Sequence, residues 1–307
     1  MKTHTAVRPV ASPPGSRPAR PRRSWWGPLF ALPHSSGLVV FVVIPAGMAL
    51  VMSLYSWPLL GEISFLGIDN YTRILSDPIF RVAVVNTVVY VLGFTVLNVL
   101  VALGLAAWLS PRIRGRHVFR VIFFIPAVTP IVANVVVWRL IYQPGGLLDQ
   151  AAAPVMGDES LDVLNQSELA MLAIIVMSVW QGFGYNMLVF SAALDAVPES
   201  LIEAARIDGA SAWQTFWRVR FPMIGPAVFF GVTMTLISSF QVFIQPFILT
   251  RGGPGSSTMT LVLYLYQSGF GNQNLGLAAA AGTIILVIIL LVTAAQFAGE
   301  KKWVNYD

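Results

Sequence analysis

Six long stretches of the sequence contain almost no charged side chains, and this feature limits the possible folds most. Each stretch has about 20 residues or more, enough for a helix to cross the hydrocarbon core of a bilayer. Charged residues make up only 11% of the 307-residue chain, against about 25% in a soluble domain. The sequence therefore predicts an all-α integral membrane protein with six transmembrane helices, at about 28–55, 82–109, 121–142, 169–190, 223–249 and 275–297.

The lysines and arginines predict the orientation of these helices, because cytoplasmic loops carry an excess of both residues. With both termini in the cytoplasm, fifteen of the nineteen lie on the cytoplasmic side: six before residue 25, four in 112–120, three in 206–220 and two at 301–302. The opposite orientation would invert that ratio. We therefore predict cytoplasmic N- and C-termini, with four exceptions on or near the outer side: Arg73, Arg81, Arg139 and Arg251.

Residues 1–24 are rich in proline and arginine. Such a segment buries too little apolar surface to fold, so we expect a disordered basic arm in the cytoplasm. The arm is similar to the start of a signal peptide, but the apolar run after it is longer than a signal peptide carries. An uncleaved anchor is therefore expected, and residues 25–307 should form the transmembrane domain.

A polar and charged stretch, about 191–222, lies between the fourth and fifth apolar runs. Gly209 stands where a left-handed residue would end a first short helix. Ser211 and Gln214 have the spacing of a capping box that opens a second helix, and Pro222 limits that helix. The pattern predicts two short helices, set at an angle to each other, on the cytoplasmic face.

The same stretch resembles the EAA signature of ABC-importer permeases, which is Glu-Ala-Ala, three residues, Gly, nine residues and Ile-x-Leu-Pro. The chain keeps this spacing from Glu203 to Pro222, with Val219 and Phe221 replacing Ile and Leu. In that family the loop docks into a groove on a separate ATPase subunit. The resemblance implies that the ATPase-coupling residues are Glu203, Ala204, Ala205, Arg206, Asp208, Gly209, Ala210 and Pro222. The alternative is an ordinary amphipathic cytoplasmic loop.

Further motifs resemble the carbohydrate-uptake permeases among these importers, of the maltose and glycerol-3-phosphate type. They are Phe65-Leu66-Gly67-Ile68-Asp69-Asn70-Tyr71, Asp77-Pro78-Ile79-Phe80, Asn86-Thr87 and Thr250-Arg251-Gly252-Gly253-Pro254. This resemblance implies the type I importer permease fold in a bacterial plasma (inner) membrane. It also implies a second homologous permease subunit, two copies of an ATPase subunit and an extracytoplasmic solute-binding protein. A homodimeric pore remains an alternative.

Several motifs that would support other functions are missing. The sequence has no Gly-x4-Gly-Lys-Ser/Thr loop that could hold ATP phosphates, so we expect no cofactor on this chain and no enzymatic activity of its own. ATP and Mg²⁺ would be bound by the partner ATPases. The chain has no cysteine and only three scattered histidines, so no metal site is expected. The net charge of +5 follows the predicted topology, so we expect membrane lipid and not nucleic acid as a partner.

Polar and aromatic residues in the third to fifth apolar runs are candidates for the substrate pathway, because amides would bond sugar hydroxyls and aromatic faces would stack on the ring. They are Asn134, Trp138, Trp180, Gln181, Tyr185, Asn186, Ser238, Gln241 and Gln245. Alternatively, these side chains join neighbouring helices. Gln241 and Gln245, four residues apart, form the preferred pair on one helix face. Arg139 and Arg251 would be interface anchors or contacts for a phosphorylated polyol.

Charged residues are scarce within the apolar runs, and ion-driven transporters place a carboxylate there. The sequence thus favours an ATP-driven importer of an uncharged carbohydrate or polyol. A phosphorylated polyol such as glycerol-3-phosphate is an alternative substrate. The rival classes are an ion-driven secondary transporter and a membrane-anchored assembly or sensor protein.

Overall fold

The computed structural model describes residues 26–110, 114–156 and 160–300, which are mostly helical. The chain divides into two compact units, 1–47 and 48–307, and each is described by itself. The predicted disordered arm at 1–24 lies outside the described residues, as do Arg112, Lys301 and Lys302.

The described part of the first unit is one apolar helical run. It comprises α1 (Trp26–Leu38), the π-helical turn η1 (Val39–Val43) and the start of α2 (Ile44–Met52), which continues into the second unit. Residues Phe30–Met52 are long and apolar enough to cross a membrane. In η1 the Ile44 N–H bonds Val39 O. This wide turn lies directly before Pro45, whose missing N–H interrupts the regular ladder.

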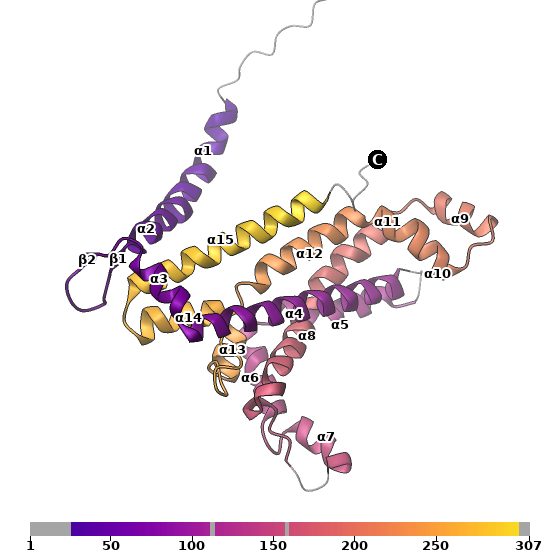
Figure 1. Cartoon of the computed structure of the whole chain (residues 1–307). Helices are drawn as coiled ribbons and strands as arrows, with labels where there is room; N and C mark the ends of the chain where they lie inside the picture. Colours follow the sequence, from indigo (N-terminus) through magenta and orange to yellow (C-terminus); the bar gives the residue numbers. More distant parts are fainter. Residues whose placement is uncertain (1–25, 111–113, 157–159, 301–307) are drawn as a thin grey trace, which may run out of the picture. The chain divides into compact units, whose positions relative to one another are not determined.

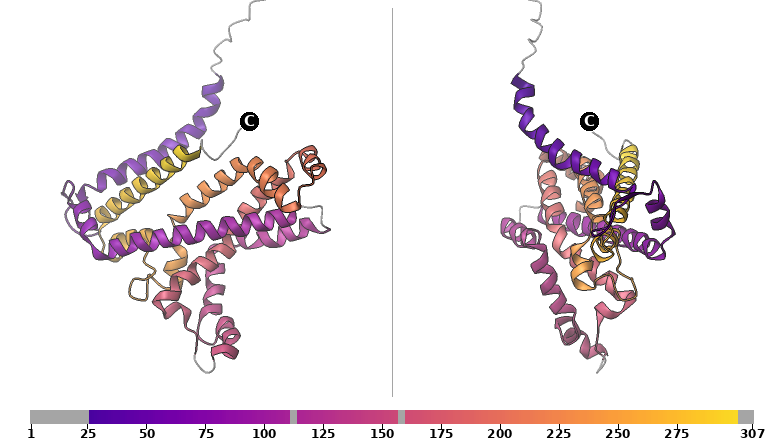
Figure 2. Two further views of the ribbon diagram at one scale, coloured as in Figure 1. Left: turned by 45° about the vertical axis from the view of Figure 1, so that its right-hand side comes forward. Right: turned by 90° about the vertical axis from the view of Figure 1, so that its left-hand side faces the viewer.

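The second unit begins with the end of α2, continues with a hairpin and is helical after it (Figures 1 and 2). In the hairpin, β1 (Tyr55–Ser56) pairs antiparallel with β2 (Ser64–Phe65). The elements before the polar stretch are α3 (Asp69–Ser76), α4 (Pro78–Leu109), α5 (Arg116–Val128), α6 (Ile131–Tyr142), α7 (Leu147–Met156), the 3-10 turn η2 (Val163–Asn165) and α8 (Ser167–Asp195). Those after residue 198 are α9 (Glu199–Ile207), α10 (Ala212–Thr215), η3 (Phe216–Arg220), α11 (Phe221–Met223), α12 (Gly225–Ser239), α13 (Ile244–Leu249), α14 (Leu261–Tyr266), η4 (Gln267–Gly271) and α15 (Leu275–Glu300).

Five of the described helical runs are long and apolar enough to span a membrane, and a sixth is reached if the bent pair Ala212–Met223 and Gly225–Ser239 counts as one span. The second, fourth and last apolar runs correspond to the single helices α4, α8 and α15. The prediction of a single helix is wrong for the third and fifth runs. The third is divided between α5 and α6, and the fifth between α12 and α13.

Proline chemistry explains the break between α5 and α6. Thr129 takes an extended conformation with ψ 137°, as the residue before a proline prefers. Pro130 has no N–H for the carbonyl of Pro126, four residues earlier. The side chain of Asn134 supplies the missing donor, with Nδ2 3.1 Å from Pro126 O. An apolar run can therefore contain a break without leaving a buried carbonyl unpaired.

The break between α12 and α13 has the same chemistry. Pro246 has no N–H for the carbonyl of Val242, and residues 240–243 are not helical. Here the replacement donor comes from a distant segment, because Thr260 Oγ1 donates to Val242 O at 3.1 Å. In each interrupted run, a side chain therefore pairs the carbonyl that the proline leaves without a backbone donor.

Helices α4 and α8 form the centre of the second unit and pack along each other. One buried cluster joins α8 to α6 and α13. Another joins the C-terminal parts of α4 and α8 to Ile202 and Ile224. A third joins α3, α4, α14 and α15. Figure 1 shows α9 and α10 at one end of this unit, with α3 and α14 at the other.

The residues of the carbohydrate-type motifs fix the connecting segments at the α3 and α14 end. Asn70 Nδ2 donates to the carbonyls of Ser53 and Tyr55, at 2.9 and 2.8 Å. Asn86 Nδ2 donates to the carbonyls of Ser256 and Met259, at 2.8 and 3.0 Å. These motif residues therefore hold the loops to α3 and α4, which is a structural role.

Candidate functional site: coupling loop and membrane hollows

The turn after α9 explains the spacing of the EAA-like signature. Gly209 has φ +80°, in the left-handed region that glycine adopts without strain. The Gly209 N–H bonds Arg206 O at 3.0 Å, and the Ala210 N–H bonds Ala205 O at 2.9 Å. These two bonds form a Schellman motif, which pairs carbonyls that a helix end leaves free. Gly209 is therefore required four residues after Ala205 by backbone geometry.

The second short helix begins with the predicted capping box. Ser211 Oγ accepts from the Gln214 N–H at 3.3 Å, and the Ser211 N–H donates to Gln214 Oε1 at 2.8 Å. The helix continues through the wide turn η3 to Met223. The prediction that Pro222 limits this helix is therefore wrong. In η3 the Phe221 N–H bonds Phe216 O, which lets the chain pass the proline. A bend of 70° then separates this helix from α12.

The loop exposes one face and anchors the other. Ile202 is only 3% exposed and packs in the core cluster with Leu194, Val197 and Ile224. Ile207 is 87% exposed at the tip. Of the predicted coupling residues, the exposed ones are Glu203, Ala204, Arg206, Asp208, Gly209 and Pro222, and the half-buried ones are Ala205 and Ala210. A partner could therefore dock on α9 without disturbing its anchor.

Two hollows lie beside the breaks in the interrupted helices. One, of about 340 Å³, is lined by residues of α4, α6 and the α12–α13 break, including Ser238, Gln241 and Gln245. The other, of about 240 Å³, includes Gln181, Tyr185 and Gln245. They share Phe94, Ile131 and Gln245, so they adjoin. Among the described residues that line them there is no charged side chain.

The structure thus brings five of the predicted pathway residues together: Gln181, Tyr185, Ser238, Gln241 and Gln245. Gln181 Oε1 is buried without a hydrogen-bond partner within the described chain. The prediction that Gln241 and Gln245 lie on one helix face is wrong, because residues 242 and 243 between them are not helical. They still line one hollow.

The other four predicted pathway residues do not line these hollows, and the pathway role of all nine stays a prediction. Asn134 bonds the carbonyl of Pro126. Trp138 contacts Trp180 edge to face, with ring centres 5.6 Å apart. Asn186 is 3% exposed. Its Nδ2 donates to Asn98 Oδ1 and to Thr235 Oγ1, both at 2.7 Å.

The sequence predictions missed several residues that the fold places at the first hollow or beside Asn186. Tyr90 and Phe94, four apart on α4 and stacked with ring centres 5.5 Å apart, face the first hollow. Their spacing of four residues in the second apolar run indicates one helix face, and this signal was available in the sequence. Asn98 and Thr235 gave no such signal, because their partner Asn186 lies 88 and 49 positions away.

No group of three or more His, Asp or Glu side chains in the described ranges could hold a metal ion. Arg139 and Arg251 are exposed, and neither lines the two hollows. Both salt bridges found within 26–110, 114–156 and 160–300 involve Asp195, at the end of α8.

Residues 98–304 match the family described as "Binding-protein-dependent transport system inner membrane component". This match includes the polar stretch at about 191–222, which is the predicted coupling loop, and most residues around the hollows. The chain belongs to this family. It is accordingly a transport component of the bacterial inner membrane, as the sequence predicted.

Relatives with similar sequences support the same assignment. The probable ABC transporter permease protein YurN of Bacillus subtilis is 34% identical over 78% of this chain and 83% of its own length. The sn-glycerol-3-phosphate transport system permease protein UgpA of Agrobacterium fabrum is 36% identical over 91% of this chain and 95% of its own length.

Solved structures show the same fold. A chain from the bacterial alginate ABC transporter, crystallised with an alginate pentasaccharide-bound periplasmic protein, matches with a TM-score of 0.79. The match has 20% identity and covers 91% of this chain and 95% of that one. A chain of the MetNI methionine ABC transporter matches with a TM-score of 0.53 over 75% of this chain. The fold is therefore that of type I ABC importer permeases.

Proposed function

We propose that this chain is a permease subunit of an ATP-driven importer for an uncharged carbohydrate or polyol. ATPase subunits would dock on the exposed face of α9, and their closure around ATP and Mg²⁺ would move the spans between inward-facing and outward-facing states. The observation that carries the proposal is the α9 turn. The Schellman motif at Gly209 and the buried Ile202 hold a charged and apolar face open for a partner.

The hollows support an uncharged substrate. Amide side chains and hydroxyls line them, together with the aromatic rings of Tyr90 and Phe94. Buried amides need hydrogen-bond partners, and sugar hydroxyls can supply them. The alginate transporter that shares the fold takes an acidic polysaccharide, which agrees with a carbohydrate substrate and leaves the absence of charge to rest on the lining of the hollows.

The remaining components follow from the same proposal. Six spans with cytoplasmic termini would provide half of a pore, and a second homologous permease would complete it. Two ATPase subunits would each contact one coupling loop, and an extracytoplasmic solute-binding protein would deliver the substrate. The relatives' names refer to permeases, and the alginate structure contains a periplasmic protein.

The coupling role is tested by Glu203→Lys, which reverses the charge of an exposed α9 residue. We expect the variant to reach the membrane in normal amount but to lose ATP-driven uptake and copurification of the ATPase. Glu62→Lys is the matched control, because Glu62 lies in the β1–β2 hairpin at the other end of the unit. Normal uptake by Glu203→Lys would refute the coupling role.

A second candidate substrate is a phosphorylated polyol, because a relative with 36% identity is named as a glycerol-3-phosphate permease. The uncharged lining of both hollows favours the neutral substrate. Substrate-stimulated ATPase of the reconstituted transporter, measured with its binding protein, decides between them. Stimulation by glycerol-3-phosphate and not by neutral sugars would select the second candidate.

Solute uptake by the same reconstituted transporter separates the rival classes. Uptake that continues without ATP in vesicles that keep an ion gradient would indicate a secondary transporter. A complex that never moves solute would indicate an assembly or sensor protein.

A further inference from the structure

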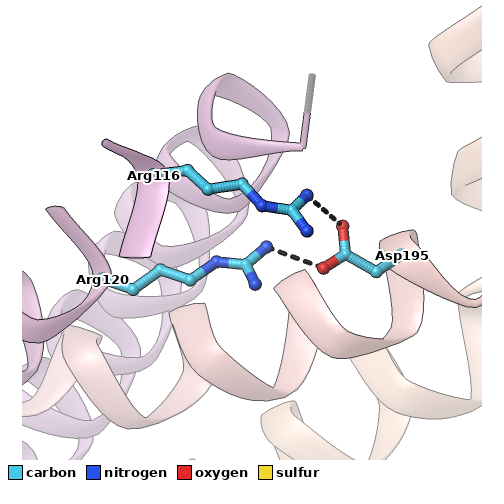
Figure 3. Close-up of polar contacts among 3 residues, drawn as sticks. All are labelled: Arg116, Arg120 and Asp195. Atoms are coloured by element: carbon cyan, nitrogen blue, oxygen red, sulfur yellow. Dashed lines mark hydrogen bonds and ion pairs between the residues drawn. The ribbon is translucent and has the colours of Figure 1, made fainter. Parts of the chain in front are cut away.

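Asp195 is the last residue of α8 and stands directly before the coupling loop. Its carboxylate faces two arginines of α5 (Figure 3). Arg120 Nη2 lies 3.0 Å from Asp195 Oδ2, and Arg116 Nη1 lies 3.6 Å from Oδ1. Because the arginines are four residues apart, they occupy neighbouring turns on one face of α5. One carboxylate therefore joins two turns of α5 to the final turn of α8.

The position of this acid is unfavourable for α8 alone. The C-terminus of a helix carries partial negative charge and disfavours a carboxylate in its last turn. The last turn of α8 contains no basic residue that would compensate. Both compensating cations come from α5, so the acid serves a connection between two helices.

Helix α5 also contacts α8 further along. A Cβ atom at Gly184 would lie 2.5 Å from the carbonyl oxygen of Phe123, so the two backbones meet there. Beyond the Thr129–Pro130 break, the Tyr142 hydroxyl donates to Ala173 O at 2.9 Å. The uninterrupted α8 therefore holds both halves of the broken run, α5 and α6, with the break between the attachment points.

Next to Asp195, a hollow of about 360 Å³ separates part of α9 from α5. Arg116 lines it from α5, and Glu199, Ile202 and Arg206 line it from α9. Direct packing between these two helices is therefore incomplete. The chain runs from the end of α8, where Asp195 lies, directly into α9, so a displacement of α9 can reach α5 through Asp195.

We propose that Asp195 is a positioning residue that makes α5 follow the coupling loop, through Arg120 and Arg116. The proposal deepens the proposed function and rests on it. When the ATPases close, the end of α8 and α5 would move together. The break at Thr129–Pro130 would let α6 respond separately, which changes the hollow lined by Ala127 and Ile131.

The test uses the complete transporter in proteoliposomes and measures substrate imported per ATP hydrolysed. Asp195→Asn keeps the shape and removes the charge, and Asp195→Glu keeps the charge. We expect Asp195→Asn to assemble and hydrolyse ATP while its import per ATP falls several-fold, and Asp195→Glu to restore most of the ratio. Arg114→Gln is the matched control, because it removes a cation of the same segment that forms no salt bridge within the described residues.

Spin labels on α5 and α8, at His117→Cys and Ala192→Cys, report whether the helices move together through the ATP cycle. We expect one narrow distance distribution in the parent chain and a broader, nucleotide-dependent one with Asp195→Asn. An unchanged ratio and distribution would overturn the proposal. An equal loss of ATP hydrolysis and import in an assembled transporter would also overturn it, by showing a structural role.

If Asp195→Asn does not assemble, the exchange of Asp195→Arg with Arg120→Asp carries the test. Restored import per ATP supports the proposal, and an unrestored ratio in an assembled transporter overturns it. Failure of the proposed function is recognised separately, because the parent transporter would then show no ATP-driven import. The spin-label distances would still decide the link between α5 and α8.

Discussion

Gly209 shows how a single backbone conformation sets up the coupling loop. No heavy atom lies within 4 Å of the position that a Cβ would occupy there, so space does not explain the glycine. Its φ of +80° does, because other residues adopt this region at a cost of about 1–2 kcal/mol. Asparagine is among the few side chains that tolerate it.

We therefore expect Gly209→Val to weaken ATPase binding and uptake strongly, because valine opposes the left-handed turn by at least about 1–2 kcal/mol. Gly209→Asn, which fits the turn, should keep most of both activities. Copurification of the ATPase and initial uptake rates measure the difference. If asparagine were as damaging as valine, a contact at the glycine itself would replace the conformational explanation.

Local residue patterns could be predicted from the sequence, whereas distant contacts could not. The Gly209 turn and the Ser211–Gln214 box depend on residues within a few positions of one another, so their spacing was sufficient. The partners of Asn186 are on α4 and α12. A single sequence shows that such an amide needs a partner, but only the fold shows which one it has.

At the scale of elements, the two broken helices share one arrangement. Each has a proline that frees a carbonyl, and each carbonyl accepts from a side chain: Pro126 O from Asn134 and Val242 O from Thr260. Both breaks border the hollows, and irregular backbone at membrane depth is tolerated where it lines a cavity. The breaks therefore provide space and polar groups, as the proposed pathway for a solute requires.

Restoring the regular helix should impair transport without removing the protein. Pro130→Ala returns an N–H that can bond Pro126 O, which favours a continuous α5–α6 helix and reshapes the hollow lined by Ile131. We expect normal membrane levels and a large loss of uptake. Pro33→Ala in α1 is the control, because Pro33 lines neither hollow. Equal uptake by both variants would show that the break is not needed.

Asn134→Leu tests the same break by removing the side chain that pairs the freed carbonyl. It leaves Pro126 O without its donor, at a cost of about 0.6–2 kcal/mol, typical of a hydrogen bond between membrane segments. We expect a lower thermal unfolding temperature in detergent and partial uptake. Unchanged stability would mean that another group pairs with the carbonyl.

The sequence predicted the apolar runs well because length and composition decide whether a segment can cross a bilayer. It did not predict which prolines break a run. Pro45 follows a wide turn inside a continuous helical run, whereas Pro130 separates two helices. At Pro130 the side chain of Asn134 pairs the freed carbonyl, and that pairing is visible only in the fold.

At the scale of the whole molecule, α8 links the two candidate sites. Its middle carries Gln181 and Tyr185 at one hollow, and its end, Asp195, precedes the coupling loop. A helix of 29 residues without interruption can transmit a displacement along its length. The proposed coupling to an ATPase requires the loop to face the cytoplasm and the hairpin at the other end of the unit to face outward.

The absence of cysteine makes that orientation directly testable, because a single introduced thiol is the only one to react. Leu60→Cys in the hairpin and Ile207→Cys at the loop tip replace side chains that are 85% and 87% exposed. In intact spheroplasts, a membrane-impermeant maleimide should label residue 60 and leave residue 207 unlabelled. After permeabilisation residue 207 should react, and added ATPase subunit should protect it while residue 60 stays reactive. Labelling of residue 207 from outside would reverse the topology, and no ATPase could then act on α9.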